Sequence, residues 1–244
     1  MNKISIITGA GTGIGRALAL ELTTNRSKKI LGIGRRVQKL RELEIYYPER
    51  IKICAADVST EEGRNKIAEA IPADTTIEFL VHNAAILDPV KPLVEISLDK
   101  WRNHMSINVD GPLFLTQSLL KYMDHSRILH ISSGAAHHPY MGWGAYCTSK
   151  SALHMIYQVL RDELKDKGIL VGSIRPGIVD TPMQDNVRQV PEENFPMRSK
   201  FIGFKENNQL SDPAIVGQQL AKFLCDTTDA VFSEKELDLR ETKF

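Results

Sequence analysis

The stretch TGAGTGIG, residues 8–15, places four glycines between two apolar segments of different periodicity. Before it, residues 3–8 read KISIIT, a short run that predicts a buried strand. After it, residues 15–24 read GRALALELTT, which indicates a helix. Glycines at such a turn let backbone N–H groups approach a phosphate, and the helix N-terminus favours negative charge. The stretch predicts a phosphate-binding turn, although a tight turn without ligand remains an alternative for this motif alone.

Short apolar runs alternate with helix-like segments along most of the chain. The further strand-like runs are residues 28–34, 51–57, 77–83, 127–133 and 169–177. Between and after them, helical periodicity appears in residues 37–46 and in the stretch that follows Tyr146. This alternation predicts parallel strands joined by right-handed helical crossovers. We therefore expect a single α/β domain over residues 1–244, with a Rossmann-like, doubly wound parallel sheet and helices on both faces.

Residues 181–210 interrupt this alternation. Their periodicity is weak, and a new helix start appears only at Ser211, where the sequence reads SDPA. A substrate-binding lid is one interpretation of this segment, and a plain surface excursion is the other.

The overall composition is that of an ordinary globular protein. Of 244 residues, 42% are hydrophobic, and 31 basic side chains balance 30 acidic ones. This balance favours neither nucleic acid nor an anionic membrane as partner. No apolar run is long enough for a membrane span, and the N-terminal run is too short for the core of a signal peptide. We expect a cytoplasmic protein.

Cysteine and histidine spacing gives no sign of a disulfide framework or a metal site. Cys54, Cys147 and Cys225 are widely separated and form no CxxC pair. His137 and His138 have no partner at a metal-ligand spacing. We therefore expect reduced thiols and no bound metal.

The stretch GAYCTSK, residues 144–150, carries a tyrosine and a lysine four positions apart. On a helix, Tyr146 and Lys150 project from the same face. A free tyrosine has a pKa of about 10, and a nearby ammonium lowers that pKa by stabilising the phenolate. The pair suggests acid–base chemistry, although taken alone it is more often a pair of surface neighbours.

The glycine stretch and the Tyr146-x-x-x-Lys150 pair together resemble the short-chain dehydrogenase/reductase family over nearly the whole chain. Further motifs of that family occur in its order: His82-Asn83-Ala84-Ala85, Asn108 in SINVDG, Ile131-Ser132-Ser133, and Arg175-Pro176-Gly177 with Thr181. Residues 133–146, 180–184 and 231–241 are similar to the branch that contains sepiapterin reductase and the benzil reductases. The resemblance implies hydride transfer between a nicotinamide dinucleotide and a small-molecule carbonyl compound.

The family's catalytic residues carry over to four positions. The serine that bonds the substrate carbonyl lies thirteen residues before the tyrosine, which selects Ser133 over Ser132. By the resemblance, Tyr146 passes the proton, Lys150 holds the nicotinamide ribose and favours the tyrosinate, and Asn108 positions a water. A buried structural asparagine is the alternative for Asn108.

The resemblance also implies NADPH/NADP as the cofactor. Gly34 stands where members that use NAD carry an acidic residue, and Arg35 follows it, as in members that bind the 2′-phosphate. The alternative is that Arg35 and Arg36 only solvate a helix start. Asp57 matches the aspartate that contacts the adenine amine. The implied cofactor-binding residues are Gly9, Thr12, Gly13, Ile14, Gly15, Arg35, Arg36, Asp57, Val58, Asn83, Ala84, Tyr146, Lys150, Pro176, Gly177, Val179 and Thr181.

Branch similarity implies an aromatic or vicinal diketone as substrate, held by Ser133, Tyr140, Trp143 and Tyr146. The aromatic residues before the helix could equally pack beneath a loop or at a dimer interface, and we expect a homodimer or homotetramer. Two other functions stay open: an NAD(P)-linked alcohol dehydrogenase acting on a sugar or steroid, and a dinucleotide-sensing regulatory module.

Overall fold

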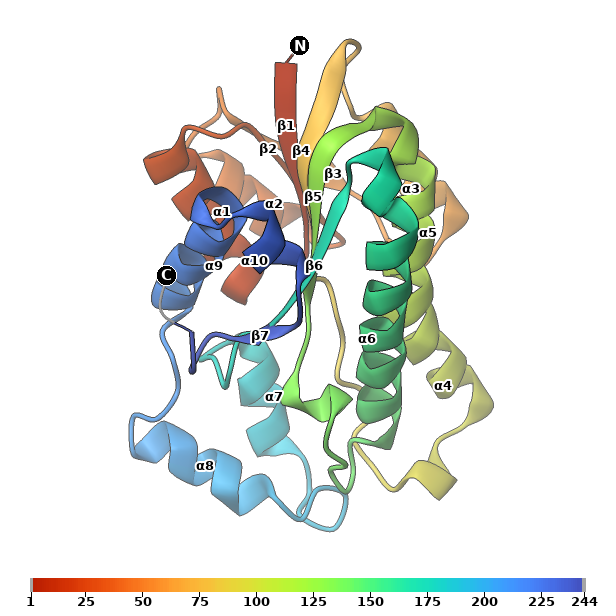
Figure 1. The fold of residues 1–244 in the computed structure, drawn as a ribbon. Coiled ribbons are helices and arrows are strands. Elements are labelled where there is room, and N and C mark those ends of the chain that lie inside the picture. The colour runs from red at the N-terminus through yellow and green to blue at the C-terminus, as the bar shows by residue number, and fades with distance from the viewer. Residues whose placement is uncertain (1, 243–244) are drawn as a thin grey trace.

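The computed structural model describes residues 2–242, which form one seven-stranded parallel sheet (Figure 1). Its order is β3-β2-β1-β4-β5-β6-β7, and every neighbouring pair is parallel. The strands are β1 (Asn2–Thr8), β2 (Ile30–Gly34), β3 (Ile51–Ala55), β4 (Thr75–His82), β5 (Met123–Ile131), β6 (Leu170–Arg175) and β7 (Leu237–Asp238). The expected doubly wound α/β fold is confirmed. Winding reverses between β1 and β4, which opens a crevice at the carboxyl ends of the strands.

Helices cover both faces of the sheet (Figure 1). One face carries α1 (Gly13–Arg26), α2 (Val37–Glu44), α9 (Pro213–Asp226) and α10 (Asp229–Ser233), and the other carries α3 (Glu61–Glu69), α4 (Leu98–Met105), α5 (Gly111–Leu119) and α6 (Gly144–Leu164). Successive strand residues point to opposite faces, so Ile7 joins the core beneath α1 and Ile6 the core beneath α6. With both faces covered, the central part of each strand is largely buried, as the run ILGIG of β2 illustrates.

Residues 181–210 contain two helices that the weak periodicity did not predict. These are α7 (Pro182–Gln189) and α8 (Arg198–Glu206), and Figure 1 shows them beyond the carboxyl ends of the strands. Each helix buries only one side chain, Val187 in α7 and Phe201 in α8, which explains the absence of a clear apolar repeat. Whether this segment moves as a lid remains a prediction.

None of the helices within residues 2–242 is long and apolar enough to cross a membrane.

Candidate active site

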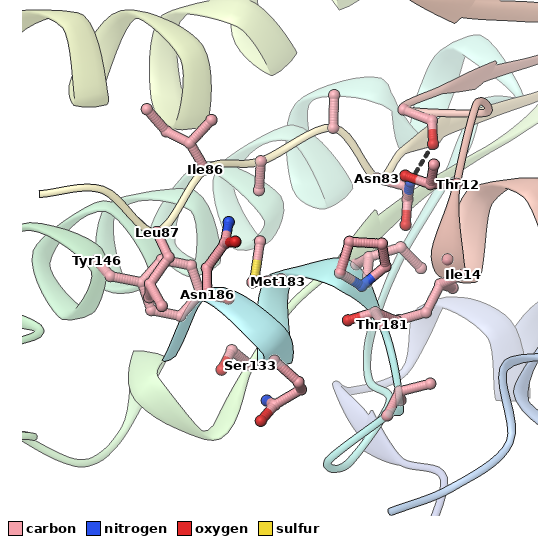
Figure 2. Close-up of a pocket in the computed structure, with 18 of the residues that line it drawn as sticks. Thr12, Ile14, Asn83, Ile86, Leu87, Ser133, Tyr146, Thr181, Met183 and Asn186 are labelled. Carbon is pink, nitrogen blue, oxygen red and sulfur yellow. Dashed lines mark hydrogen bonds between the residues drawn. The ribbon is translucent and has the colours of Figure 1, made fainter. Parts of the chain in front are cut away.

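A cleft of about 930 Å³ lies at the carboxyl ends of the strands, where the crevice was expected. Figure 2 shows Thr12 and Asn83 toward one end of it, and Tyr146 with Leu87 toward the other. Of the predicted cofactor-binding residues, all line the cleft except Gly15. Among the other predicted residues, Ser133, Tyr140 and Trp143 also line it, whereas Asn108 does not.

The glycine turn is shaped by close backbone contacts. Gly9 has φ +68°, and a Cβ there would lie 2.7 Å from Asn83 Nδ2. A Cβ on Gly15 would lie 2.5 Å from the Gly9 carbonyl oxygen, so Gly15 supports the turn from behind. Asn83 fixes the turn to β4, because its side-chain amide donates to the Thr8 carbonyl at 2.9 Å.

This turn fits a dinucleotide pyrophosphate. The side chain of Thr12, which precedes α1, caps none of the N–H groups in the first turn of that helix. Such groups, at the positive end of a helix dipole and beside a glycine-rich cradle, bind phosphate oxygens.

Two arginines stand at the end of the cleft nearest β2. Arg35 Nη1 lies 3.8 Å from Asp57 Oδ2, with the Arg35 side chain 57% exposed. Arg36 donates to the Thr12 hydroxyl at 3.2 Å. The other carboxylate oxygen of Asp57 accepts from the Ser59 backbone N–H at 3.0 Å and from its hydroxyl at 2.7 Å. The loose Arg35–Asp57 pair leaves the guanidinium free to turn toward a phosphate.

Tyr146 and Lys150 lie one turn apart on α6, and both are buried. Lys150 Nζ donates to the Ile131 carbonyl at 2.7 Å and stands 5.7 Å from the centroid of the Tyr146 ring. Burial raises the pKa of Tyr146 to about 12, and a hydrogen bond with Ser133 only partly opposes that rise. Burial also lowers the pKa of Lys150 to about 8, with Glu236 opposing.

The expected lowering of the Tyr146 pKa by the ammonium is therefore wrong for this arrangement. Desolvation is the larger effect, and the ammonium is held by a backbone carbonyl rather than by the phenol. At neutral pH Tyr146 keeps its proton, which suits a proton donor.

The two adjacent serines, Ser132 and Ser133, have different surroundings. Ser133 lines the cleft and shares a hydrogen bond with Tyr146. Ser132 is buried, and its hydroxyl lies near enough to Glu236 to lower the pKa of that carboxyl. This arrangement favours Ser133 as the hydroxyl that meets a substrate.

Asn108 is buried in the π-helical turn Ser106–Asp110, between α4 and α5. Its side chain accepts from the Ile86 N–H at 2.9 Å and donates to the Ile86 carbonyl at 2.8 Å. The side chain thus anchors the loop after β4, and the water-positioning role stays a prediction.

His104 also forms a hydrogen bond with Asn108, and it was not predicted from the sequence as a residue near the site. Its Nδ1 bonds the Asp88 carbonyl at 2.8 Å and so carries a proton, which leaves Nε2 to accept from Asn108 Nδ2 at 2.9 Å. The same nitrogen lies 3.0 Å from the Ser149 hydroxyl on α6. Burial lowers the His104 pKa and keeps the ring neutral. A histidine one helical turn before Asn108 was the available signal.

Trp143 lies both in the wall of the cleft and in a cluster of aromatic side chains, and its contact with a substrate stays a prediction. It lines the cleft, yet it is only 7% exposed and stacks on Phe195 at a centroid distance of 4.9 Å. Its ring also meets the Tyr146 ring edge-on at 5.7 Å. Met141, in contrast, is 73% exposed and does not line the cleft. Trp143 therefore packs beneath the 181–210 segment while closing one wall.

A sequence profile described as short chain dehydrogenase matches residues 3–192. The protein belongs to the short chain dehydrogenase family. This membership makes it an oxidoreductase and implies a nicotinamide dinucleotide as cofactor, in agreement with the glycine cradle at the start of α1.

Relatives of this dehydrogenase differ in their substrates. It is 31% identical over 231 residues to a benzil reductase, (S)-benzoin forming, of Bacillus cereus, an alignment that covers 90% of this chain and 92% of the relative. A serine 3-dehydrogenase of Agrobacterium fabrum is 32% identical over 184 residues, 74% of each chain. The crystal structure of a short chain dehydrogenase/reductase from Saccharomyces cerevisiae superposes with a TM-score of 0.89 at 26% identity, covering 99% of this chain and 97% of that one.

Proposed function

We propose that this dehydrogenase is an NADPH-dependent carbonyl reductase whose substrate is an aromatic or vicinal diketone. The observation that carries the proposal is the apolar wall around the Tyr146 end of the cleft, formed by Leu87, Val90, Tyr140, Trp143, Met183, Val187 and Phe201. Such a wall can hold a flat ring, while an adjacent carbonyl makes the acceptor carbon more electrophilic. The benzil reductase of Bacillus cereus, at 31% identity, supports the same substrate class.

Bound NADPH would supply the hydride, and side chains of the protein would bind and protonate the carbonyl oxygen of the substrate. We assign Ser133 to bond the carbonyl oxygen and Tyr146 to give it a proton as negative charge develops there. The raised pKa of Tyr146, about 12, keeps that proton available at neutral pH. Lys150, held against the Ile131 carbonyl, faces the same region and is assigned to the nicotinamide ribose.

An alcohol dehydrogenase running toward the ketone is the second candidate. The serine 3-dehydrogenase relative, at 32% identity, favours it, because that protein's name describes oxidation of a hydroxyl compound. Initial rates in the two directions separate these candidates. Reduction is measured with NADPH and benzil, other diketones, sepiapterin, simple aldehydes or sugar ketones. Oxidation is measured with NAD or NADP and serine, sugars or steroid alcohols. Absence of turnover across both panels would favour the dinucleotide-sensing module.

Tyr140→Ala tests the apolar wall. Because loss of an aromatic contact removes at least ~1.4 kcal/mol, we expect kcat/KM for benzil to fall about tenfold, with a much smaller change for a small aldehyde. Tyr46→Ala is the matched control, since Tyr46 is 58% exposed and lies outside the cleft. Equal losses for benzil and the aldehyde would contradict a substrate-facing role for Tyr140.

The pH dependence of reduction follows from Lys150. Its pKa is lowered to about 8, so the charged form is lost above that pH, whereas Tyr146, near 12, keeps its proton. We expect kcat/KM for NADPH at saturating ketone to fall as pH rises through about 8. Cys147→Ser is the control, because it removes a thiol whose own pKa burial raises. A flat profile up to pH 9.5 would contradict the assignment.

We further infer a cytoplasmic homodimer or homotetramer. Apolar side chains remain exposed on the outer face of α5 and α6, including Phe114 at 42%, Met155 at 58% and Val159 at 45%. Exposed apolar side chains on neighbouring helices are typical of a subunit contact. Sedimentation velocity measures the oligomeric state directly.

A further inference from the structure

Two histidines and a glutamate that are distant in sequence meet behind the turn that carries Ser133. His137 ends the turn Gly134–Ala136, His154 lies on α6, and Glu236 precedes β7. His137 Nε2 is 2.5 Å from one Glu236 carboxylate oxygen, and His154 Nδ1 is 3.2 Å from the other. His137 has no partner at ligand spacing in the sequence, but the fold brings His154 and Glu236 to it.

The donor atoms of this cluster form a ligand set for a borderline divalent metal. One nitrogen from each imidazole and one oxygen from the carboxylate all lie within 4.8 Å of one another. Two histidines and one carboxylate are a recurrent zinc set, which leaves the fourth tetrahedral position to water. We propose that His137, His154 and Glu236 bind Zn²⁺ at a site separate from the cleft.

The environment of Glu236 supports this site. Its side chain is only 6% exposed, and the Ser173 hydroxyl donates to its Oε1 at 2.8 Å, which fixes the carboxylate as an outer-shell partner fixes a metal ligand. The His137 side chain is 33% exposed and gives solvent access to the cluster.

Arg175 is a cation that also lies beside the Glu236 carboxylate. Arg175 Nε lies 3.4 Å from Glu236, but Arg175 also reaches Asp238, at 3.6 Å. Neither contact is a hydrogen bond, and Asp238 has a closer partner in Arg240 at 2.6 Å, so Arg175 is held only loosely beside Glu236. Zinc ligands bound at about 2.0–2.1 Å stand roughly 3.3–3.4 Å apart in a tetrahedron. The His154–Glu236 separation of 3.2 Å is close to that spacing, whereas His137 Nε2, at 2.5 Å from the carboxylate, must shift to admit a metal, and the partly exposed His137 ring can do so.

Binding at this site would join three segments of the chain: the turn after Ser133, helix α6 and the C-terminal segment. The ligands come together only in the folded protein, so bound zinc stabilises the folded state and raises the melting temperature.

The test uses the full chain after treatment with a chelator that is then removed. Calorimetric titration with Zn²⁺ is expected to show one site per chain, and Co²⁺ to give the strong visible absorption of a tetrahedral complex. His137→Gln, His154→Gln and Glu236→Gln should each weaken zinc binding at least about tenfold and abolish the rise in melting temperature. His137→Gln is the variant least expected to disturb folding, because the His137 side chain is partly exposed.

Two matched controls separate this site from adventitious binding. His138→Gln removes the adjacent exposed histidine, and Cys147→Ser removes the thiol that contacts the His138 carbonyl at 3.6 Å. Both are expected to bind zinc like the wild type. Unchanged binding by His137→Gln and Glu236→Gln, or no binding by the wild type at micromolar zinc, would overturn the proposal and leave a metal-free His–Glu contact.

Discussion

Tyr146→Phe is expected to lower kcat for ketone reduction by about 10²- to 10⁴-fold, because it removes the proton that the developing alkoxide needs. The Tyr146 hydroxyl shares a hydrogen bond with Ser133, and its raised pKa, about 12, keeps it protonated at the pH of an assay. The phenylalanine ring keeps the edge-on contact with Trp143, so the fold and the cleft should persist. Steady-state rates with NADPH and benzil measure the loss.

The control for this variant is Tyr157→Phe on the same helix. Tyr157 is 1% exposed and lines no part of the cleft, so loss of its hydroxyl should leave kcat within about twofold of the wild type. Fluorescence titration of NADPH should give similar Kd values for both variants and the wild type. A folded Tyr146→Phe protein with near-normal turnover would refute the proposed proton donor.

Local patterns in the sequence predicted the features of the fold that local physics determines. Strands β1 to β6 each contain an apolar run that helices bury on both faces, and the alternation of these runs with helices predicted the doubly wound sheet. β7 was not anticipated, since two residues, Leu237–Asp238, are too few to form a pattern. The short helices α7 and α8 were not predicted either, because each buries a single side chain and so shows no apolar repeat.

In the candidate site, the predictable contacts are those within one helix or one turn. Tyr146 and Lys150 share a face of α6, and the spacing alone shows it. The contact between His104 and Ser149 joins two helices, and the contact between His137 and Glu236 spans 99 residues. Neither contact can be predicted from the spacing of residues that are close in the sequence. The direction of the Tyr146 pKa shift was also beyond the sequence, because it depends on burial.

Arg35→Ala is expected to raise KM for NADPH far more than KM for NADH. The Arg35 side chain is 57% exposed and only loosely paired with Asp57 at 3.8 Å, so it can turn to the 2′-phosphate through its planar fork. A hydrogen bond to a charged group contributes roughly 1.5–3 kcal/mol, which corresponds to about ten- to a hundredfold in cofactor discrimination. Arg41→Ala is the control, because Arg41 lies on α2 outside the cleft.

Gly34→Asp should shift cofactor preference toward NADH, because it places a carboxylate where the ribose hydroxyls accept it and the phosphate is repelled. The substitution fits sterically, because the nearest atom to a Cβ at Gly34 would be Leu40 Cδ2 at 3.5 Å, an ordinary contact. Added salt should narrow the wild-type preference, since exposed charges are screened over about 10 Å at 0.1 M ionic strength. The measurement is kcat/KM for each cofactor at low and high salt. If the wild type uses NADH as well as NADPH, Arg35 binds no phosphate, and an NAD-linked alcohol dehydrogenase becomes the better proposal.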